Sequence, residues 1–211
     1  MADSGQPQPW IDRATLRLAV ERLTAEDARL AAIVARHGHP PLWRRRPGFA
    51  TLLLFILEQQ VSLASARVAF ARLAAAIGEV APRRFLTLSD GELRAIGFSR
   101  QKARYGRSLA TGMLDGSIVL PGRAAPDDDA RRALLAVVGV GPWTADCYLL
   151  FVLGRPDVWP SGDRALQVSM GRVLSLRATP TARQAHAIAE TWRPWRSVAA
   201  RLLWHDYLSG R

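Results

Sequence analysis

The sequence predicts an all-α protein with about ten helices. Apolar residues recur at helical spacing along most of the 211-residue chain, and no stretch alternates between apolar and polar residues for more than a few positions. The bends between these stretches fall at glycine and proline, the residues that most often interrupt helices. Nearly half of the residues are apolar, so the chain can bury a sizeable core.

The expected helices follow the chain in order. Residues 1–10 are rich in proline and glutamine and are expected to form a loose tail before a domain over residues 11–211. Helical spacing predicts one helix from Asp12 to about His37, and a strongly apolar stretch predicts a centrally buried helix over residues 49–59. Further helices are expected to begin near Ser62 and Leu88, to follow a turn at residues 97–103 as far as Met113, to start at Asp127–Asp129, and to cover residues 163–174 and 181–209.

The composition restricts the classes of partner and site. The 29 Lys and Arg residues exceed the 18 Asp and Glu residues, and the formal net charge of +11 favours a polyanion such as nucleic acid. A compositional bias is the alternative, because arginine is abundant and lysine nearly absent. One cysteine excludes an internal disulfide and a four-cysteine cluster, and the four histidines lack zinc-ligand spacing. The first residues do not resemble a signal peptide and the apolar runs are too short to span a bilayer, so we expect a cytoplasmic protein that does not bind membranes.

A glycine hairpin is the most informative motif. Gly139 and Gly141 bracket Val140, and Pro142 suits the first turn of a following helix. Such a turn can direct consecutive amides and a helix N-terminus at an anion, which suits a phosphodiester. The alternative is an ordinary connection between two helices with a glycine cap. A carboxylate, Asp163, follows about one helix and a loop later.

The wider pattern resembles the helix–hairpin–helix DNA glycosylase superfamily, and is similar to its bacterial 3-methyladenine DNA glycosylase II type. The segments that carry the resemblance are residues 56–62, 96–103, 138–145, 149–163 and 192–197, together with Trp204. The resemblance covers about residues 45–205. It implies two helical lobes with an active cleft between them: a middle lobe over about residues 50–160 that contains the hairpin, and a second lobe from the N-terminal and C-terminal helices. The N-terminal β domain of longer members is not expected, because residues 1–44 are few and helical.

The resemblance gives Asp163 the catalytic role. Cleavage of an N-glycosidic bond builds positive charge on the sugar, and a fixed carboxylate stabilises that charge or orients water. The alternative role for Asp163 is to cap the helix that starts at Arg164. Asp146 is interpreted as a solvated or capping group, and Asp157 as a residue that fixes a loop. Bifunctional relatives carry a nucleophilic lysine where this chain has Trp143, and an indole cannot form a Schiff base.

The aromatic residues indicate the class of base. Trp143 and Trp204 fall on the family's pocket positions, and an electron-rich pocket favours a cationic alkylated purine swung out of the duplex. Cys147 replaces a tyrosine that lines the pocket in longer relatives, and Tyr148 follows it. Core packing is favoured for Trp192 and Trp195.

The resemblance also implies contacts with DNA. Gln60 is expected to act as the wedge that fills the gap left by the flipped nucleotide, with Gln59 as the alternative. The main-chain and side-chain groups expected to contact the DNA backbone belong to Ser62, Lys102, Gly139, Val140, Gly141 and Thr144. Arg100, Arg104 and Arg44–Arg46 are further candidates, and the alternative for all these charges is a solvated surface. The hairpin carbonyls of Val138 and Val140 are expected to be able to hold a weakly bound cation.

Together these features predict a monomeric, monofunctional glycosylase that removes alkylated purines from double-stranded DNA. No organic cofactor and no obligate protein partner are expected. The rival interpretations are a non-catalytic DNA-binding module with the same fold and a bifunctional glycosylase/lyase. The sequence does not rank the damaged bases.

Overall fold

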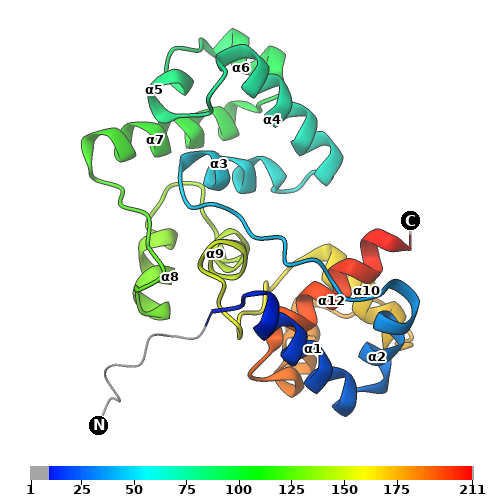
Figure 1. The fold of residues 1–211 in the computed structure, drawn as a ribbon. Coiled ribbons are helices and arrows are strands. Elements are labelled where there is room, and N and C mark those ends of the chain that lie inside the picture. Colours follow the sequence, from blue (N-terminus) through cyan, green and yellow to red (C-terminus); the bar gives the residue numbers. More distant parts are fainter. Residues whose placement is uncertain (1–9, 211) are drawn as a thin grey trace. The chain divides into compact units, whose positions relative to one another are not determined.

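The computed structural model describes residues 10–210 (Figure 1). Within that range there are twelve α-helices, one π-helix and one 3-10 helix, and no residue belongs to a strand. The predicted all-α class is therefore confirmed. The loose tail expected at residues 1–10 lies almost wholly outside the described residues.

The chain divides into two compact units. The hairpin unit comprises residues 45–148, and the terminal unit comprises the described residues up to Arg44 and from Leu149 onward. Residues 149–160, expected in the hairpin lobe, group with the terminal unit by contacts.

The hairpin unit is built around a helix that is apolar on all sides. Six consecutive residues of α3, Leu52 to Leu57, are buried, and α3 packs against α4, α7 and α9. Serine hydroxyls cap the N-termini of α4, α6 and α7, which explains why these helices begin where they do. The helices of this unit are α3 (Phe49–Glu58), α4 (Leu63–Ile77), α5 (Pro82–Phe85), α6 (Asp90–Ile96), α7 (Arg100–Asp115), α8 (Asp127–Leu135) and α9 (Pro142–Tyr148).

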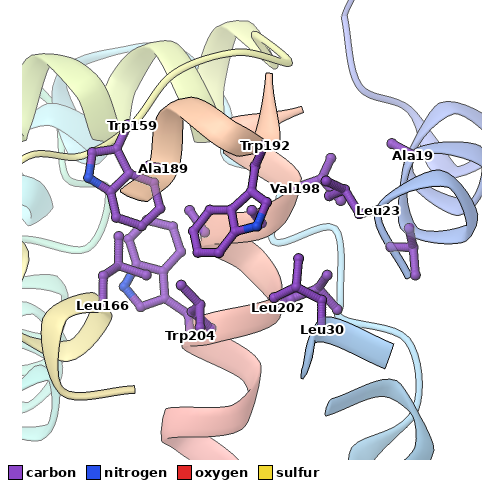
Figure 2. Close-up of a cluster of buried hydrophobic side chains, with 14 of the residues drawn as sticks. Ala19, Leu23, Leu30, Trp159, Leu166, Ala189, Trp192, Val198, Leu202 and Trp204 are labelled. Carbon is purple, nitrogen blue, oxygen red and sulfur yellow. The ribbon is translucent and has the colours of Figure 1, made fainter. Parts of the chain in front are cut away.

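The terminal unit has a core rich in tryptophan. Trp159, Trp192 and Trp204 are buried in one cluster, shown in Figure 2, and the ring centroids of Trp159 and Trp192 lie 5.9 Å apart. Trp195 packs against the same cluster, so core packing of Trp192 and Trp195 is confirmed. The elements of this unit are α1 (Arg13–Glu26), α2 (Ala28–His37), the π-helix η1 (Leu149–Leu153), α10 (Arg164–Val173), α11 (Ala182–Ala189), the 3-10 helix η2 (Glu190–Trp192) and α12 (Arg196–Ser209).

Two expected helices are each interrupted. The helix predicted over residues 12–37 breaks at Asp27, whose carboxylate accepts hydrogen bonds from the Arg29 amide and the Trp192 indole. This side chain caps α2 and competes with continuation of α1. The helix predicted over residues 181–209 breaks before α12, where Pro194 has no amide hydrogen to donate to a helical bond.

Between residues 10 and 210, none of the helices combines the length and the apolar character that crossing a membrane requires.

Candidate active site and DNA-contacting hairpin

The hairpin joins α8 to α9 through a turn that requires glycine at one position. Gly139 has a φ of +88°, and a Cβ placed there would lie 2.4 Å from the ring of Tyr105. The Val140 amide donates to the Val137 carbonyl at 3.0 Å, which closes the turn before α9 begins at Pro142. A Cβ at Gly141 would have no atom within 4 Å, and this residue needs no unusual φ. Only the first glycine is therefore demanded by the fold of the hairpin itself.

Gln59 connects the wedge loop, which is the segment between α3 and α4 that contains the predicted wedge Gln60, to the hairpin. Its Nε2 donates to the Gly139 carbonyl at 2.8 Å and to the Thr144 hydroxyl at 2.9 Å. The Thr144 side chain is buried and its hydroxyl accepts the bond from Gln59, so a contact of Thr144 with the DNA backbone stays a prediction. These bonds also engage the Gln59 side chain, which leaves Gln60 as the better candidate for the wedge.

Gln60 stands at the exposed end of that loop. Its φ of +57° is in the left-handed region, which non-glycine residues rarely adopt. Two residues later Ser62 accepts a hydrogen bond from the Ser65 amide at 3.1 Å and so starts α4. The Ser62 hydroxyl is thus a helix cap, and its predicted contact with the DNA backbone stays a prediction.

Lys102 does not extend into solvent. Its Nζ donates to the Leu57 carbonyl at 2.7 Å and to the Gln59 carbonyl at 2.8 Å, at the C-terminal end of α3. Burial lowers the pKa of Lys102 from its usual value, since a low-dielectric surrounding disfavours the charged form. The interpretation of Lys102 as a solvated charge is wrong, and a contact of its ammonium with phosphate would compete with these two carbonyls.

Asp163 is fixed at the start of α10. Its Oδ1 accepts from the Leu166 amide at 2.9 Å and from the indole Nε1 of Trp204 at 3.2 Å. The capping interpretation of Asp163 is therefore confirmed, and it is compatible with catalysis because the carboxylate remains partly exposed. Its catalytic role stays a prediction.

Two residues that the sequence analysis did not single out support Trp204. The Phe151 ring stacks on Trp204 with centroids 5.1 Å apart, and the Arg201 guanidinium lies 5.1 Å from the Phe151 centroid. Arg201 is buried, donates to the Leu150 carbonyl at 3.1 Å, and has its pKa lowered to about 9 by burial. The π-helix η1 supplies both Phe151 and this carbonyl. The signal that could have found them was an arginine within the apolar stretch of α12.

The other two predicted pocket residues of this stretch lie in the core. Cys147 and Tyr148 are buried, and the Tyr148 hydroxyl is 3.5 Å from the Pro121 carbonyl. Neither side chain presents an exposed face to a base in this structure. Trp143 is partly exposed, and its role in a pocket stays a prediction.

Tyr148 gives a testable pH dependence. Burial raises the pKa of Tyr148 to about 12, above its ordinary value. The unfolded chain therefore loses this proton first, so the stability from the neutral phenol is complete below pH ~10 and is lost as the pH rises toward ~12. This contribution should reach about 2–3 kcal/mol, because each tenfold difference in proton affinity corresponds to about 1.4 kcal/mol. The lowered pKa of Arg201 contributes with the opposite sign over the same pH range, because there the unfolded chain keeps a proton that the folded chain has lost. Urea unfolding of the wild type and of Tyr148→Phe at several alkaline pH values measures it. The stability of the wild type relative to this variant should fall by about 2–3 kcal/mol between pH ~10 and ~12, because the contribution of Arg201 is common to both proteins and cancels. A difference that does not change with pH would contradict the prediction.

Two further carboxylates are structural. Asp146 is buried beside the Arg131 guanidinium, so the prediction of a solvated or capping group is wrong: an ion pair within the hairpin unit holds it. Asp157 accepts from Arg193 and Arg196 in the terminal unit, and its predicted role in fixing the loop after Gly154 is confirmed.

The expected cation would depend on main-chain carbonyls. Among residues 10–210 no three His, Cys, Asp or Glu side chains gather into a metal site. Carbonyl oxygens suit a hard, weakly held cation, but the Gly139 carbonyl between Val138 and Val140 already accepts from Gln59. The cation at Val138 and Val140 stays a prediction.

The remaining arginine candidates are partly engaged. Arg45 lies 3.9 Å from the Glu58 carboxylate, and the Arg46 carbonyl accepts from the Thr51 hydroxyl at 2.6 Å. Arg44, Arg100 and Arg104 are exposed, as a contact with the DNA backbone requires.

The comparisons with known proteins agree on one protein family. Residues 53–194 match the model of the HhH-GPD superfamily base excision DNA repair proteins. A putative DNA-3-methyladenine glycosylase of Bacillus subtilis is 32% identical over 189 residues, which cover 84% of this chain and 65% of that protein. A probable bifunctional transcriptional activator/DNA repair enzyme of Mycobacterium tuberculosis is 35% identical over 160 residues, 71% of this chain and 31% of that protein.

A solved structure extends the comparison to the fold. The crystal structure of a DNA-3-methyladenine glycosidase from Bacillus halodurans aligns with a TM-score of 0.71 and 27% identity, and the alignment covers 90% of this chain and 88% of that one. By contrast, the chain spans less than two thirds of the two curated relatives. The family match covers more than half of the chain and includes the hairpin and Asp163, so this chain belongs to the HhH-GPD superfamily of base excision DNA repair proteins.

Proposed function

We propose that this protein is a monofunctional DNA glycosylase that hydrolyses the N-glycosidic bond of alkylated purines in double-stranded DNA. The observation that carries the proposal is the placement of Asp163, a partly exposed carboxylate held by a helix amide and by the indole of Trp204. The names of the relatives in Bacillus subtilis and Bacillus halodurans support 3-methyladenine as the type of base.

For this reaction the protein has mainly to position the nucleotide and to stabilise the positive charge that develops on its sugar. An alkylated purine such as 3-methyladenine is cationic, so it leaves as a neutral base without a proton from an acid. As the C1′–N bond breaks, the electron pair goes to the base and positive charge develops on the sugar. The Asp163 carboxylate stabilises this charge, water adds at C1′, and the water's proton is lost to the carboxylate or to solvent.

The aromatic residues supply the binding energy for the base. Trp204 carries one face of its indole against Phe151 and is oriented by its bond to Asp163. A preorganised indole favours a cationic ring through stacking and cation–π attraction. Trp143 is proposed to add a second aromatic surface.

The small number of lysine side chains argues against a lyase reaction. Lys102 is the only lysine in the sequence, and its ammonium is bound by two main-chain carbonyls. A Schiff base with the sugar needs a deprotonated amine within reach of the anomeric carbon. The protein should therefore leave an abasic site with the strand intact.

The damaged DNA is the proposed partner. The net charge of +11 favours association with the polyanion. The proposed phosphate contacts are the amides of Gly139 and Gly141 together with Arg44, Arg100 and Arg104, because the Val140 amide already donates to the Val137 carbonyl. The proposed location is the compartment that holds the chromosome, the cytoplasm and nucleoid of a bacterial cell.

Release of bases from methylated DNA tests the proposal. Duplex DNA that contains 3-methyladenine and 7-methylguanine should yield free base, and strands should break only after alkali. Unmethylated duplex is the control, and borohydride should trap no covalent adduct. Strand cleavage without alkali would favour the lyase, and tight binding to damaged duplex without release of any base would favour the non-catalytic module.

A further inference from the structure

We infer that Lys102 and Gln59 are positioning residues for the wedge, and that they lock Gln60 and the glycine hairpin into one rigid DNA-reading element. The inference rests on the proposed function, because a wedge matters only if a nucleotide leaves the duplex. Neither residue is proposed to touch the reacting atoms.

The first part of the argument is the backbone of Gln60. A left-handed φ of +57° is unfavourable for a long side chain and persists only where the surroundings impose it. The residue is exposed, so burial of its side chain does not impose this conformation. The constraint comes from the residues immediately before it.

Lys102 supplies the first constraint. The last carbonyls of a helix have no partner within the helix, and Lys102 satisfies those of Leu57 and Gln59 with one ammonium. Charged donors to carbonyls are stronger than neutral ones, and the cation suits the negative end of the dipole of α3. The main chain immediately before Gln60 is therefore held at two carbonyls, those of Leu57 and Gln59.

The identity of residue 102 agrees with this role. Lys102 is the single lysine among the 29 Lys and Arg residues of this chain, and the remaining 28 are arginines. A compact ammonium can divide its donors between two carbonyls in a partly buried position, whereas a guanidinium is planar and needs more room. The single lysine thus stands where the local geometry favours a point charge.

A closed cycle of contacts links the wedge loop to the hairpin. Gln59 donates to the Gly139 carbonyl and the Thr144 hydroxyl, and Tyr105 packs against Gly139 from α7, one turn after Lys102. Helix α7 therefore fixes both loops, and Gln59 joins them directly. All of these contacts lie inside the hairpin unit. Because Gln60 and the glycine hairpin are joined in this way, they keep a fixed spacing when they contact the duplex.

The experiment compares a lesion that must be flipped with one that is already unpaired. Base release is measured for one alkylated purine in a paired duplex and in a single-nucleotide bulge, where the wedge has less to do. Lys102→Met keeps the length of the side chain and removes the ammonium. We expect it to lower the rate on the paired substrate by about tenfold or more, because misplacement of about 1 Å can cost that much, while the rate on the bulge changes by less than about threefold.

The control is another cation on the same helix. Arg107 donates to the Leu88 carbonyl and to Asp90, far along the chain from the wedge loop. Arg107→Met should lower both rates by the same factor if it lowers either. Lys102→Arg should recover part of the paired rate, and Gln59→Met should repeat the selective loss. Equal loss on both substrates for Lys102→Met, or no loss on the paired one, would overturn the inference.

A second readout separates this inference from the proposed function. The fluorescence of 2-aminopurine next to the lesion reports unstacking of the duplex without any chemistry. Wild-type protein should raise it on paired DNA, Lys102→Met should raise it much less, and Arg107→Met should match wild type. If wild-type protein released no base from either substrate, the proposed function would fail, and the fluorescence of the variants would still decide whether Lys102 and Gln59 position Gln60. If Lys102→Met does not fold, as circular dichroism would reveal, Gln59→Met and Lys102→Arg carry the same comparison.

Discussion

Asparagine in place of Asp163 should reduce base release by about a thousandfold, because a fixed negative charge next to the developing positive sugar is the largest single contribution expected in this site. The substitution is close to isosteric. An asparagine oxygen can still accept from the Leu166 amide and from the Trp204 indole, which are the two bonds that hold Oδ1. The rate of release should therefore fall while the affinity for damaged duplex stays within about threefold.

The same substitution at another helix cap provides the control. Asp12 accepts from the Thr15 amide at 2.8 Å at the start of α1, in the same unit as Asp163. Asp12→Asn should leave the rate unchanged, and both variants should unfold at temperatures close to that of the wild type. Single-turnover release from methylated duplex measures the rate. An Asp163→Asn protein that released bases at the wild-type rate would remove Asp163 from the mechanism.

Alanine in place of Gly139 should destabilise the hairpin more than any other single-methyl change in that turn. The φ of +88° disfavours a side chain, and the added Cβ would lie 2.4 Å from the Tyr105 ring. Left-handed strain and forced repacking together should cost about 3 kcal/mol. For a chain of this size the melting temperature should fall by about 6–12 °C. Affinity for DNA should fall as well, because the hairpin amides and the bond from Gln59 to Gly139 depend on this turn.

Gly141 is the matched control two residues away. Its φ is ordinary and no atom would lie within 4 Å of a Cβ, so Gly141→Ala should melt within about 2 °C of the wild type. Thermal melts monitored by circular dichroism compare the two. Equal stability of both variants would show that the turn rearranges around Tyr105. A Gly141→Ala protein with normal stability but weaker binding to DNA would indicate that the backbone at Gly141 approaches the phosphate closely.

The local features of this protein can be predicted from its sequence. The strongly apolar stretch predicted α3 almost to the residue, a helix start was correctly expected near Ser62, a capping Ser or Asp predicted the start of α6, and the acidic run predicted the start of α8. These features depend on neighbours within one or two turns, so the pattern of residues is sufficient. The glycine hairpin and the carboxylate of Asp163 could likewise be predicted, because each belongs to a short contiguous motif.

Interactions between distant segments cannot be predicted in this way. Lys102 was expected to contact phosphate or to be a solvated charge, yet its ammonium binds carbonyls more than 40 residues earlier in the chain. Tyr148 follows the hairpin and looked suited to a pocket, yet the fold buries it and directs its hydroxyl toward Pro121. Burial and long-range partners depend on how helices pack, and the spacing of residues along one helix does not specify the neighbour that covers it.

The sequence by itself determined the helical class, the glycine turn, the candidate carboxylate Asp163, and the presence at position 143 of a tryptophan, which cannot form a Schiff base. Only the tertiary structure decided that Asp163 and Trp204 share a hydrogen bond, that Phe151 and Arg201 lie behind this pair, and that Gln59 ties the wedge loop to the hairpin. The physical reason is range. Caps, turns and periodicity are set by residues a few positions apart, whereas the geometry of a site is set by side chains that only packing of the folded chain brings into contact.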